Sequence, residues 1–422
     1  MEPGLQNVRY ATGEQSVDEL NAEFYGQIRY PWPPQYFERV KRADLGGLML
    51  AQDIGHWGAR ILPEEARIWV AGCGTNQALF TALRFPHARV LGSDLSAESL
   101  AACAENAASL GIANLELRRE SINQVRYSSR FDYVICTGVI HHNADPLLPL
   151  SRLAGALKPE GLLELMVYNQ YHRILSSAFQ NAVRGLLGNP SRPDLARELP
   201  VARRLIASLR GDMLMPSFLG TLAGAPDAAF ADTLLQPVEH SFTVGSLAEA
   251  ARRCDLEMLT FCQDSRGRGE GETEWNLGFG DEHLDPLYLA LSDVERWHIT
   301  NLLMAESSPL LWFYLQRLDC PRPRKPERQI CEEFLDRRFV RVKTEREIFT
   351  RLPDAGYSRS PRVSPYPGEP RQPLARRIAA ELDEAAPLRE TLRRLGIEPT
   401  FVECNRLRLN LATSSCPYLE AA

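Results

Sequence analysis

Short apolar runs alternate with longer amphipathic stretches over residues 66–170 of this chain. Each run is bounded by glycine, proline or charged residues, a pattern that predicts buried strands. The stretch 96–110 has helical spacing instead, with Leu100 and Leu110 on one face and Ser96 placed as the N-cap. Strands and helices that alternate in this way are typical of a parallel, doubly wound α/β sheet. The predicted strands are 66–72, 88–94, 115–119, 131–138 and 161–169.

Two further apolar runs, 256–261 and 309–318, bring the predicted sheet to seven strands. The segments 173–240 and 265–305 then interrupt the sheet as insertions. Both follow strands, and ligands of open α/β sheets bind at the carboxyl edge of the strands. We therefore expect the two insertions to form a cap over a ligand site.

The strand pattern divides the chain into three parts. Residues 1–65 precede the sheet and are expected to form an N-terminal lid or cap. Residues 66–319 form the predicted core with its insertions, and residues 320–422 form a C-terminal accessory region.

Local signals predict further element boundaries outside the first five strands. The spacing of Ser246 and Glu249 predicts a capping box at the start of a helix. In the accessory region, 374–395 has helical periodicity and Phe401–Leu411 alternates like a strand.

The composition is that of an ordinary globular protein, with 44% hydrophobic and 24% charged residues among 422. The sequence has no apolar run of about 18 residues and no secretory signal pattern, so we expect a cytoplasmic protein without a membrane partner. The nine cysteines never occur as Cys-x-x-Cys, which argues against a disulfide framework or a thiolate metal site. A net charge of −6 makes nucleic acid an improbable partner.

Positive charge gathers in one proline-rich part of the accessory region. Residues 321–377 carry fifteen Lys and Arg against eight Asp and Glu. Prolines around these residues predict exposed loops or linkers. Two interpretations stay open: a solvated linker, or a surface that steers an anionic substrate toward the sheet edge. The residues expected to be exposed near that edge are Arg322, Arg324, Lys325 and Arg328.

A glycine-rich turn follows the first predicted strand. Gly72 and Gly74 allow the backbone to turn sharply and to approach a ligand closely. Asp94 lies 20 residues after Gly74, at the end of the next strand, where a carboxylate can accept hydrogen bonds from ribose hydroxyls. These features fit a dinucleotide or S-adenosylmethionine. The dinucleotide fingerprint needs a third glycine where this chain has Gln77.

Four segments together resemble the motifs of class I S-adenosylmethionine-dependent methyltransferases. They are VAGCGTNQ at 70–77, GSDLS at 92–96, FDYVICTGVIHHNADP at 131–146 and LKPEGLLEL at 157–165. The resemblance implies a Rossmann-like methyltransferase fold, a transferase activity and S-adenosyl-L-methionine as cofactor. The cofactor-binding residues that it implies are Gly72, Cys73, Gly74, Asn76, Gln77, Asp94, Leu95, Glu120, Ser121, Ile122, Thr137 and Val139.

Two positions depart from the family pattern. Asn76 stands where the family usually has glycine, and asparagine is the non-glycine residue that best tolerates a positive φ. Ser121 stands where the family has an aspartate that meets the adenine amino group. Three possibilities stay open for the group that meets the adenine amino group in this chain. It is Glu120, it is the Ser121 hydroxyl, or no side chain takes the place of the aspartate.

His141 and His142 follow the fourth predicted strand, next to the reaction site of the family. Consecutive residues of an extended chain point in opposite directions, so one histidine is expected at the site and the other in the core. By resemblance we expect His141 at the site, where an imidazole could act as a general base for a hydroxyl or protonated amine. The expected substrate-binding residues are Tyr30 and Trp32 of a lid, together with His142, Tyr168, Asn169 and His240.

The sequence thus predicts methyl transfer from S-adenosylmethionine to an unidentified small-molecule or peptide/protein acceptor, in an oligomeric state that it leaves open. Two alternatives stay open. A nicotinamide-dependent oxidoreductase is disfavoured by Gln77 and by the lack of a recognisable catalytic set in a second domain. A catalytically silent cofactor-binding scaffold is the second alternative, because of Asn76 and Ser121.

Overall fold

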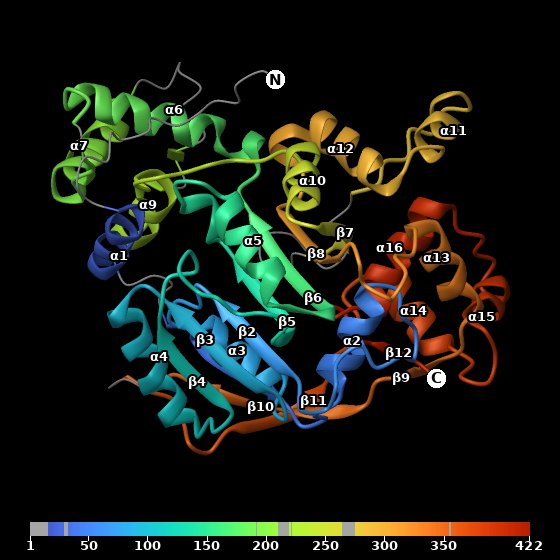
Figure 1. Ribbon diagram of the computed structural model, residues 1–422. Helices are drawn as coiled ribbons and strands as arrows, with labels where there is room; N and C mark the ends of the chain where they lie inside the picture. Colours follow the sequence, from blue (N-terminus) through green and yellow to red (C-terminus); the bar gives the residue numbers. More distant parts are fainter. Residues whose placement is uncertain are drawn as a thin grey trace.

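The computed structural model describes residues 16–28, 33–190, 192–209, 219–220, 222–263, 275–353 and 356–422. Its centre is a seven-stranded sheet with the order β4-β3-β2-β5-β6-β8-β7 (Figure 1). The strands from β4 to β6 are parallel, and β8 runs antiparallel to both of its neighbours. The predicted seven-stranded, mostly parallel sheet is confirmed. The strands are β2 (Arg67–Ala71), β3 (Arg89–Asp94), β4 (Leu115–Arg119), β5 (Phe131–Thr137), β6 (Leu157–Val167), β7 (Leu256–Phe261) and β8 (Leu311–Arg317).

Apolar cores cover both faces of the sheet. Trp69 and Val70 are neighbours on β2 and point to opposite faces. Trp69 packs in a core with α5 and α10, and Val70 packs in a second core with α2, α3 and α4. Because both faces are buried, polar groups of the sheet reach a ligand only at the strand ends. The helices are α2 (Leu45–Asp53), α3 (Gln77–Arg84), α4 (Ala97–Leu110), α5 (Leu147–Ala156) and α10 (Val244–Arg253).

The two insertions lie on different parts of the molecule. The helices α6, α7 and α9 of the first share an apolar core around Phe179 and Phe230, and the N-terminal helix α1 packs against α9 and α4 (Figure 1). In the second insertion, α12 packs on α10 instead. The elements are α1 (Val17–Ile28), α6 (Gln170–Leu186), α7 (Leu195–Ser208), α9 (Asp227–Leu234), α11 (Leu284–Leu289), α12 (Asp293–Met304) and the 3₁₀ turn η2 (Ala305–Ser307).

The C-terminal region combines a helical core with two small sheets, one of which includes the N-terminal strand β1. β1 pairs with β10 in a three-stranded antiparallel sheet, and α2 packs against β12. The N-terminal segment therefore contributes to this region as well as to the cap helices. The elements are β1 (Tyr36–Val40), α13 (Glu327–Asp336), β9 (Phe339–Arg341), β10 (Thr344–Thr350), β11 (Arg362–Tyr366), α14 (Pro373–Glu381), α15 (Leu388–Arg394), α16 (Phe401–Leu411) and β12 (Leu419–Ala421).

The strand prediction for Phe401–Leu411 is wrong, because this segment is the helix α16. Thr400 and Glu403 form a capping box that starts the helix. Leu407 and Leu411, one helical turn apart, both enter the apolar core of the C-terminal region. Burial along one helical face thus outweighs the alternation of the sequence.

Two helix boundaries also differ from the sequence prediction. The expected helix 374–395 is two helices, α14 and α15, separated by residues that include Pro387. The N-cap of α10 is Thr243 rather than Ser246. Ser246 occupies the third helical position, and its hydroxyl accepts a hydrogen bond from the Thr243 amide at 2.9 Å.

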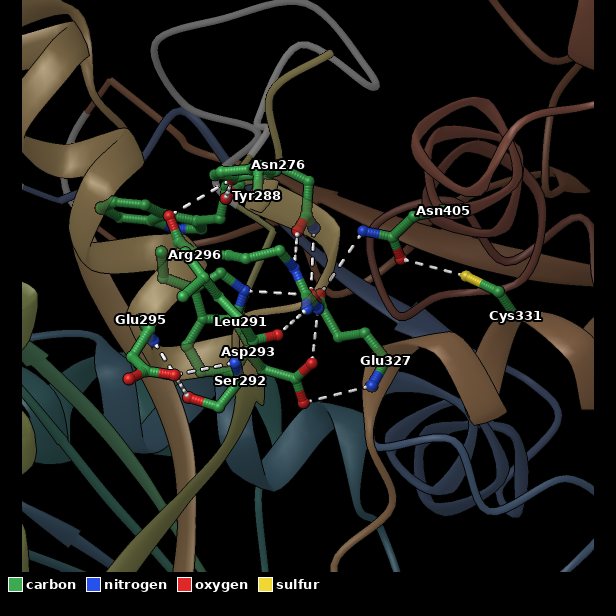
Figure 2. Close-up of polar contacts among 12 residues, drawn as sticks. Asn276, Tyr288, Leu291, Ser292, Asp293, Glu295, Arg296, Glu327, Cys331 and Asn405 are labelled. Atoms are coloured by element: carbon green, nitrogen blue, oxygen red, sulfur yellow. Dashed lines mark hydrogen bonds and ion pairs between the residues drawn. The ribbon is translucent and has the colours of Figure 1, made fainter. Parts of the chain in front are cut away.

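A buried polar network joins the second insertion to the C-terminal region (Figure 2). The Glu327 carboxylate accepts hydrogen bonds from Asn276 Nδ2 and Trp297 Nε1, both at 3.0 Å. The Arg296 guanidinium pairs with Asp293 at 2.5 Å and lies 3.5 Å from Glu327. The second insertion is therefore an anchor for the C-terminal helices.

No helix in the described part of the chain is both long and apolar enough to cross a lipid bilayer.

Candidate active site

A cavity of about 490 Å³ opens at the carboxyl ends of the parallel strands, beside α1 and α9. This is the edge where the sequence predicts the ligand site. Of the predicted cofactor-binding residues, only Ser121 is not part of its lining. The other predicted residues line the cavity: Gly72, Cys73, Gly74, Asn76, Gln77, Asp94, Leu95, Glu120, Ile122, Thr137 and Val139.

The glycine turn has the conformation that glycine alone adopts easily. Gly72 and Gly74 have φ values of +67° and +52°. A Cβ atom on Gly72 would lie 2.3 Å from Cγ2 of Val139, so a side chain here would collide with the turn after β5. The prediction of a positive φ at Asn76 is wrong. Asn76 has a φ of −139° and is the N-cap of α3.

Asp94 connects the glycine turn to the end of β3. Its Oδ2 accepts a hydrogen bond from the Gly74 amide at 2.8 Å, and its Oδ1 accepts one from the Ser96 amide at 2.9 Å. Desolvation raises the pKa of Asp94, while the backbone donors lower it. Each carboxylate oxygen has a further lone pair, so Asp94 can also accept hydrogen bonds from ligand hydroxyls in the cavity.

The side-chain partner of Ser121 is an acidic residue of α1. The Ser121 hydroxyl donates a hydrogen bond to the Asp18 carboxylate, and Asn123 Nδ2 donates a second one at 2.8 Å. Glu120 lines the cavity and accepts a hydrogen bond from the Tyr127 hydroxyl at 2.8 Å. Asp18 precedes Ser121 by about a quarter of the chain, so spacing along the sequence gave no sign of this contact.

The two histidines are arranged in the opposite way to the prediction. They belong to the 3₁₀ turn η1 (Ile140–His142), and His142 lines the cavity. His141 lies behind it, fully buried, with its ring centroid 3.9 Å from that of Tyr168. The expectation that His141 faces the site is therefore corrected: a 3₁₀ turn does not continue the alternation of a strand.

Burial also changes the acid–base behaviour of both histidines. It lowers the pKa of His142 to about 4, and it lowers the pKa of His141 well below 6.5. Both rings are therefore neutral at physiological pH. Neither fits the expected general base that titrates near working pH.

The other expected substrate-binding residues divide into three groups. Tyr168 lines the cavity. Asn169 is turned away from it: its side chain is buried, caps α6 and donates a hydrogen bond to Ser308 Oγ at 2.7 Å. His240 is not in the lining either, and its amide donates to the His141 carbonyl at 2.8 Å. Tyr30 and Trp32 lie outside the described residues.

Sequence reasoning expected a lid and a cap from the segments that contain α1 and α9, but it missed the individual residues of these helices that line the cavity. Asn21 and Tyr25 of α1 and Asp232 of α9 line it. The Tyr25 hydroxyl donates a hydrogen bond to Asp232 Oδ1 at 3.2 Å. No motif marks these residues, because they belong to two segments that meet only in the folded chain. Met166 had a local signal, since it lies two residues before Tyr168 at the end of a predicted strand.

The second insertion and the basic segment do not form part of this cavity. None of the described residues in 275–305 lines it, so the expected two-part cap is corrected to the first insertion and α1. Arg324 pairs with Asp293 and Lys325 pairs with Glu333, each at 2.5 Å. The expectation of a freely exposed basic segment is therefore wrong for these two residues.

Within the described ranges, no group of three or more His, Cys, Asp or Glu side chains is arranged to hold a metal ion.

Comparisons with known proteins identify the domain. A family model for a methyltransferase domain matches residues 67–184. The structure of PKMT2 from Rickettsia typhi has a TM-score of 0.56, is 17% identical, and the likeness covers 92% of this chain and 76% of that one. The same protein in complex with AdoHcy gives a TM-score of 0.56 at 16% identity, over 93% of this chain and 77% of that one. These structures show that the fold is shared.

A curated relative extends the likeness in sequence. An uncharacterised protein of Synechococcus sp. is 27% identical over 262 residues, which are 61% of this chain and 61% of that protein. The matched region thus spans about three fifths of the relative's length. Residues 67–184 are a methyltransferase domain, and its fold is that of the class I enzymes that use S-adenosyl-L-methionine.

Proposed function

We propose that this methyltransferase domain transfers the methyl group of S-adenosyl-L-methionine to a small-molecule or peptide/protein acceptor. The observation that carries the proposal is the joined arrangement of Gly72, Gly74 and Asp94 at one edge of the cavity. When bound, the cofactor supplies an electrophilic methyl group on a sulfonium that leaves as a neutral thioether. Alignment of the acceptor can then provide most of the rate acceleration.

The cavity suits this cofactor in size and in shape. Its volume of about 490 Å³ is within the usual range for a pocket that encloses a molecule of this size. Glycine at position 72 allows the turn to pack directly against Val139, which also lines the cavity. In the proposed complex Asp94 accepts hydrogen bonds from the ribose hydroxyls, and Leu95 and Ile122 provide apolar contact for the base.

The charges around the cavity restrict the acceptor. Three carboxylates line it, those of Asp94, Glu120 and Asp232, and no Lys or Arg is present among the described lining residues. Such a lining attracts a cationic sulfonium and disfavours anions. We therefore infer that the acceptor carries a neutral or positively charged group at its reacting end. A phosphate or carboxylate acceptor fits this lining poorly.

The oxidoreductase alternative has no support in the site. Gln77 occupies the position of the third glycine of the dinucleotide fingerprint, and its Nε2 donates a hydrogen bond to Thr137 Oγ1 at 2.6 Å. This contact places a long side chain between the turns that follow β2 and β5. In a dinucleotide site, glycine at this position allows close packing of the helix on the strand.

The test is methyl transfer from isotopically labelled S-adenosylmethionine. The full chain is incubated with a pool of neutral and cationic small molecules, with an unmodified peptide digest, and with a pool of carboxylates and phosphates as the contrast. We expect label in a product of one of the first two pools and formation of S-adenosylhomocysteine. Label only in the anionic pool would contradict the inferred acceptor class. Cofactor binding without transfer to any pool would favour the scaffold alternative.

A further inference from the structure

His142 is held in one tautomer by a backbone carbonyl. Its Nδ1 lies 2.9 Å from the carbonyl oxygen of Val238. A carbonyl can only accept a hydrogen bond, so Nδ1 carries the hydrogen and Nε2 keeps its lone pair. For Nε2 the described residues give no hydrogen bond, and His142 is one of the residues that line the cavity.

The carbonyl that fixes this tautomer is itself fixed by a buried ion pair. Glu239, next to Val238, accepts two hydrogen bonds from the Arg173 guanidinium, at 2.7 and 2.5 Å. Arg173 also donates to the Thr233 carbonyl at 2.7 Å. The segment around Val238 thus cannot turn without breaking a buried, charge-assisted pair.

Contacts from other elements hold the His142 ring and backbone. Asn21 Nδ2 of α1 donates a hydrogen bond to the His142 carbonyl at 2.8 Å. The ring of Tyr168 lies 5.2 Å from the His142 ring and perpendicular to it, at 89°. The Arg173 guanidinium covers the Tyr168 ring at 4.5 Å from its centroid. Contacts from several segments therefore hold the His142 ring in one orientation.

We propose that His142 orients the methyl acceptor, with its Nε2 lone pair accepting a hydrogen bond from the N–H or O–H of the reacting atom. This inference rests on the proposed methyl transfer. It restricts the acceptor to groups with a hydrogen on the nucleophilic atom. The lone pair of that atom forms the new bond to the methyl carbon, the sulfur–carbon bond breaks with its electron pair left on sulfur, and the displaced proton goes to water.

His142 does not keep that proton, because burial lowers its pKa to about 4. The charged and titratable groups around it are Glu239, which favours its protonated form, and Arg173, His141 and His240, which oppose it. Its role is therefore that of a fixed hydrogen-bond acceptor across the neutral pH range, and no proton is stored on the ring.

Nitrogen NMR of the full chain with ¹⁵N-labelled histidine tests the tautomer without any acceptor. The signals of His142 are assigned among the eight histidines by their loss in His142→Asn. We expect a protonated Nδ1 and an unprotonated Nε2, unchanged between pH 8 and 5.5. Glu239→Gln should loosen Val238 and mix the tautomers, whereas Val238→Ala, which keeps the carbonyl, should not. A protonated Nε2 in the unaltered chain would overturn the proposal.

Chemical modification tests whether the lone pair faces the cavity. Diethyl pyrocarbonate reacts with unprotonated imidazole nitrogens. We expect peptide mass spectrometry to show modification of His142, with less than about a twofold change in rate between pH 7 and 5.5, where an imidazole of ordinary pKa loses about eightfold. Exposed His283 is the control for reagent activity, and buried His141 should stay unmodified.

If diethyl pyrocarbonate modifies His283 but leaves His142 unmodified, the proposal is wrong. Calorimetry with S-adenosylmethionine on the same samples separates the two claims. If the cofactor binds and the His142 results fail, only this inference is wrong. If the cofactor does not bind, the proposed function is wrong, whatever the tautomer of His142.

Discussion

The amide of Gly74 donates a hydrogen bond to Asp94 Oδ2 across 2.8 Å, and this contact joins the turn after β2 to the end of β3. The Ser96 amide occupies the other carboxylate oxygen at 2.9 Å. Asp94 therefore shapes the glycine turn with the same carboxylate that faces the cavity. Loss of this side chain removes internal hydrogen bonds together with the ligand contacts of the proposed complex.

The first prediction follows from this double role. Asp94→Ala should lower the affinity for S-adenosylmethionine tenfold or more, because each charge-assisted hydrogen bond is worth about 1.5–3 kcal/mol. Asp94→Asn should weaken binding as well, since an amide presents its nitrogen toward one of the two backbone donors. The matched control is Asp145→Ala at an exposed position after β5. If calorimetry finds that the folded Asp94→Ala variant binds S-adenosylmethionine with unchanged affinity, Asp94 does not contact the cofactor.

The glycine turn allows a comparison between two glycines of similar φ. Gly72→Ala should destroy cofactor binding, because the new Cβ lies 2.3 Å from Val139 Cγ2. Gly58 has a φ of +69°, and no atom lies within 4 Å of the place that its Cβ would take. Gly58→Ala should therefore lower the free energy of unfolding only by the backbone strain, about 1 kcal/mol. Binding titrations and thermal melts of both variants provide the measurement. Equal loss of binding would show that strain, not the collision, matters.

The contact between Asp18 and Ser121 can be tested by exchanging the two side chains. Ser121→Asp introduces the residue that the family usually has, yet it should weaken S-adenosylhomocysteine binding and lower the melting temperature. The new carboxylate would lie against that of Asp18, at a cost of about 1–3 kcal/mol. Combining it with Asp18→Ser should recover at least half of the loss. If the single variant binds more tightly, the Asp18 carboxylate does not repel an acidic group at position 121.

The buried histidines predict a pH dependence of stability. The pKa of His142 falls from an ordinary 6.5 to about 4 in the folded chain, so below about pH 6.5 the unfolded chain binds a proton that the folded chain does not. Stability from this group is therefore full above pH 6.5 and is lost as the pH falls toward 4, on the order of 3 kcal/mol. His142→Asn should flatten the decline of the urea midpoint between pH 6.5 and 4. Exposed His283→Asn should leave it unchanged.

The network of Figure 2 predicts a stability effect away from the cavity. Glu327→Ala leaves Arg296 without one carboxylate and orphans two buried donors, so it should destabilise the chain by about 3–5 kcal/mol. Asp319→Ala, which breaks the exposed pair with Arg317, should leave the free energy of unfolding almost unchanged. Urea unfolding compares the two. Similar small losses would mean that the network does not anchor the C-terminal helices.

The features predicted correctly are those that depend on local sequence. The strand runs, the glycine turn and Asp94 each follow from a few adjacent residues, because a buried parallel strand must be apolar and a tight turn must contain glycine. The part of the cavity at the carboxyl ends of the strands is built from such residues, and all of the predicted ones except Ser121 line it.

The wall of the cavity at α1 and α9 depends on contacts between distant segments. Tyr25 and Asp232 meet only because α1 packs on α9, and no pattern in either segment marks the contact. The orientation of His141 and His142 depends on a 3₁₀ turn whose register the sequence does not show. Helix α16 formed against its alternating pattern because its apolar face is buried in the C-terminal core.

Calorimetric titration of the full chain decides whether the cavity holds S-adenosyl-L-methionine. We expect one binding site for S-adenosylmethionine, competition by S-adenosylhomocysteine, and no heat with NAD or NADH. Binding of a nicotinamide dinucleotide without binding of S-adenosylmethionine would contradict it.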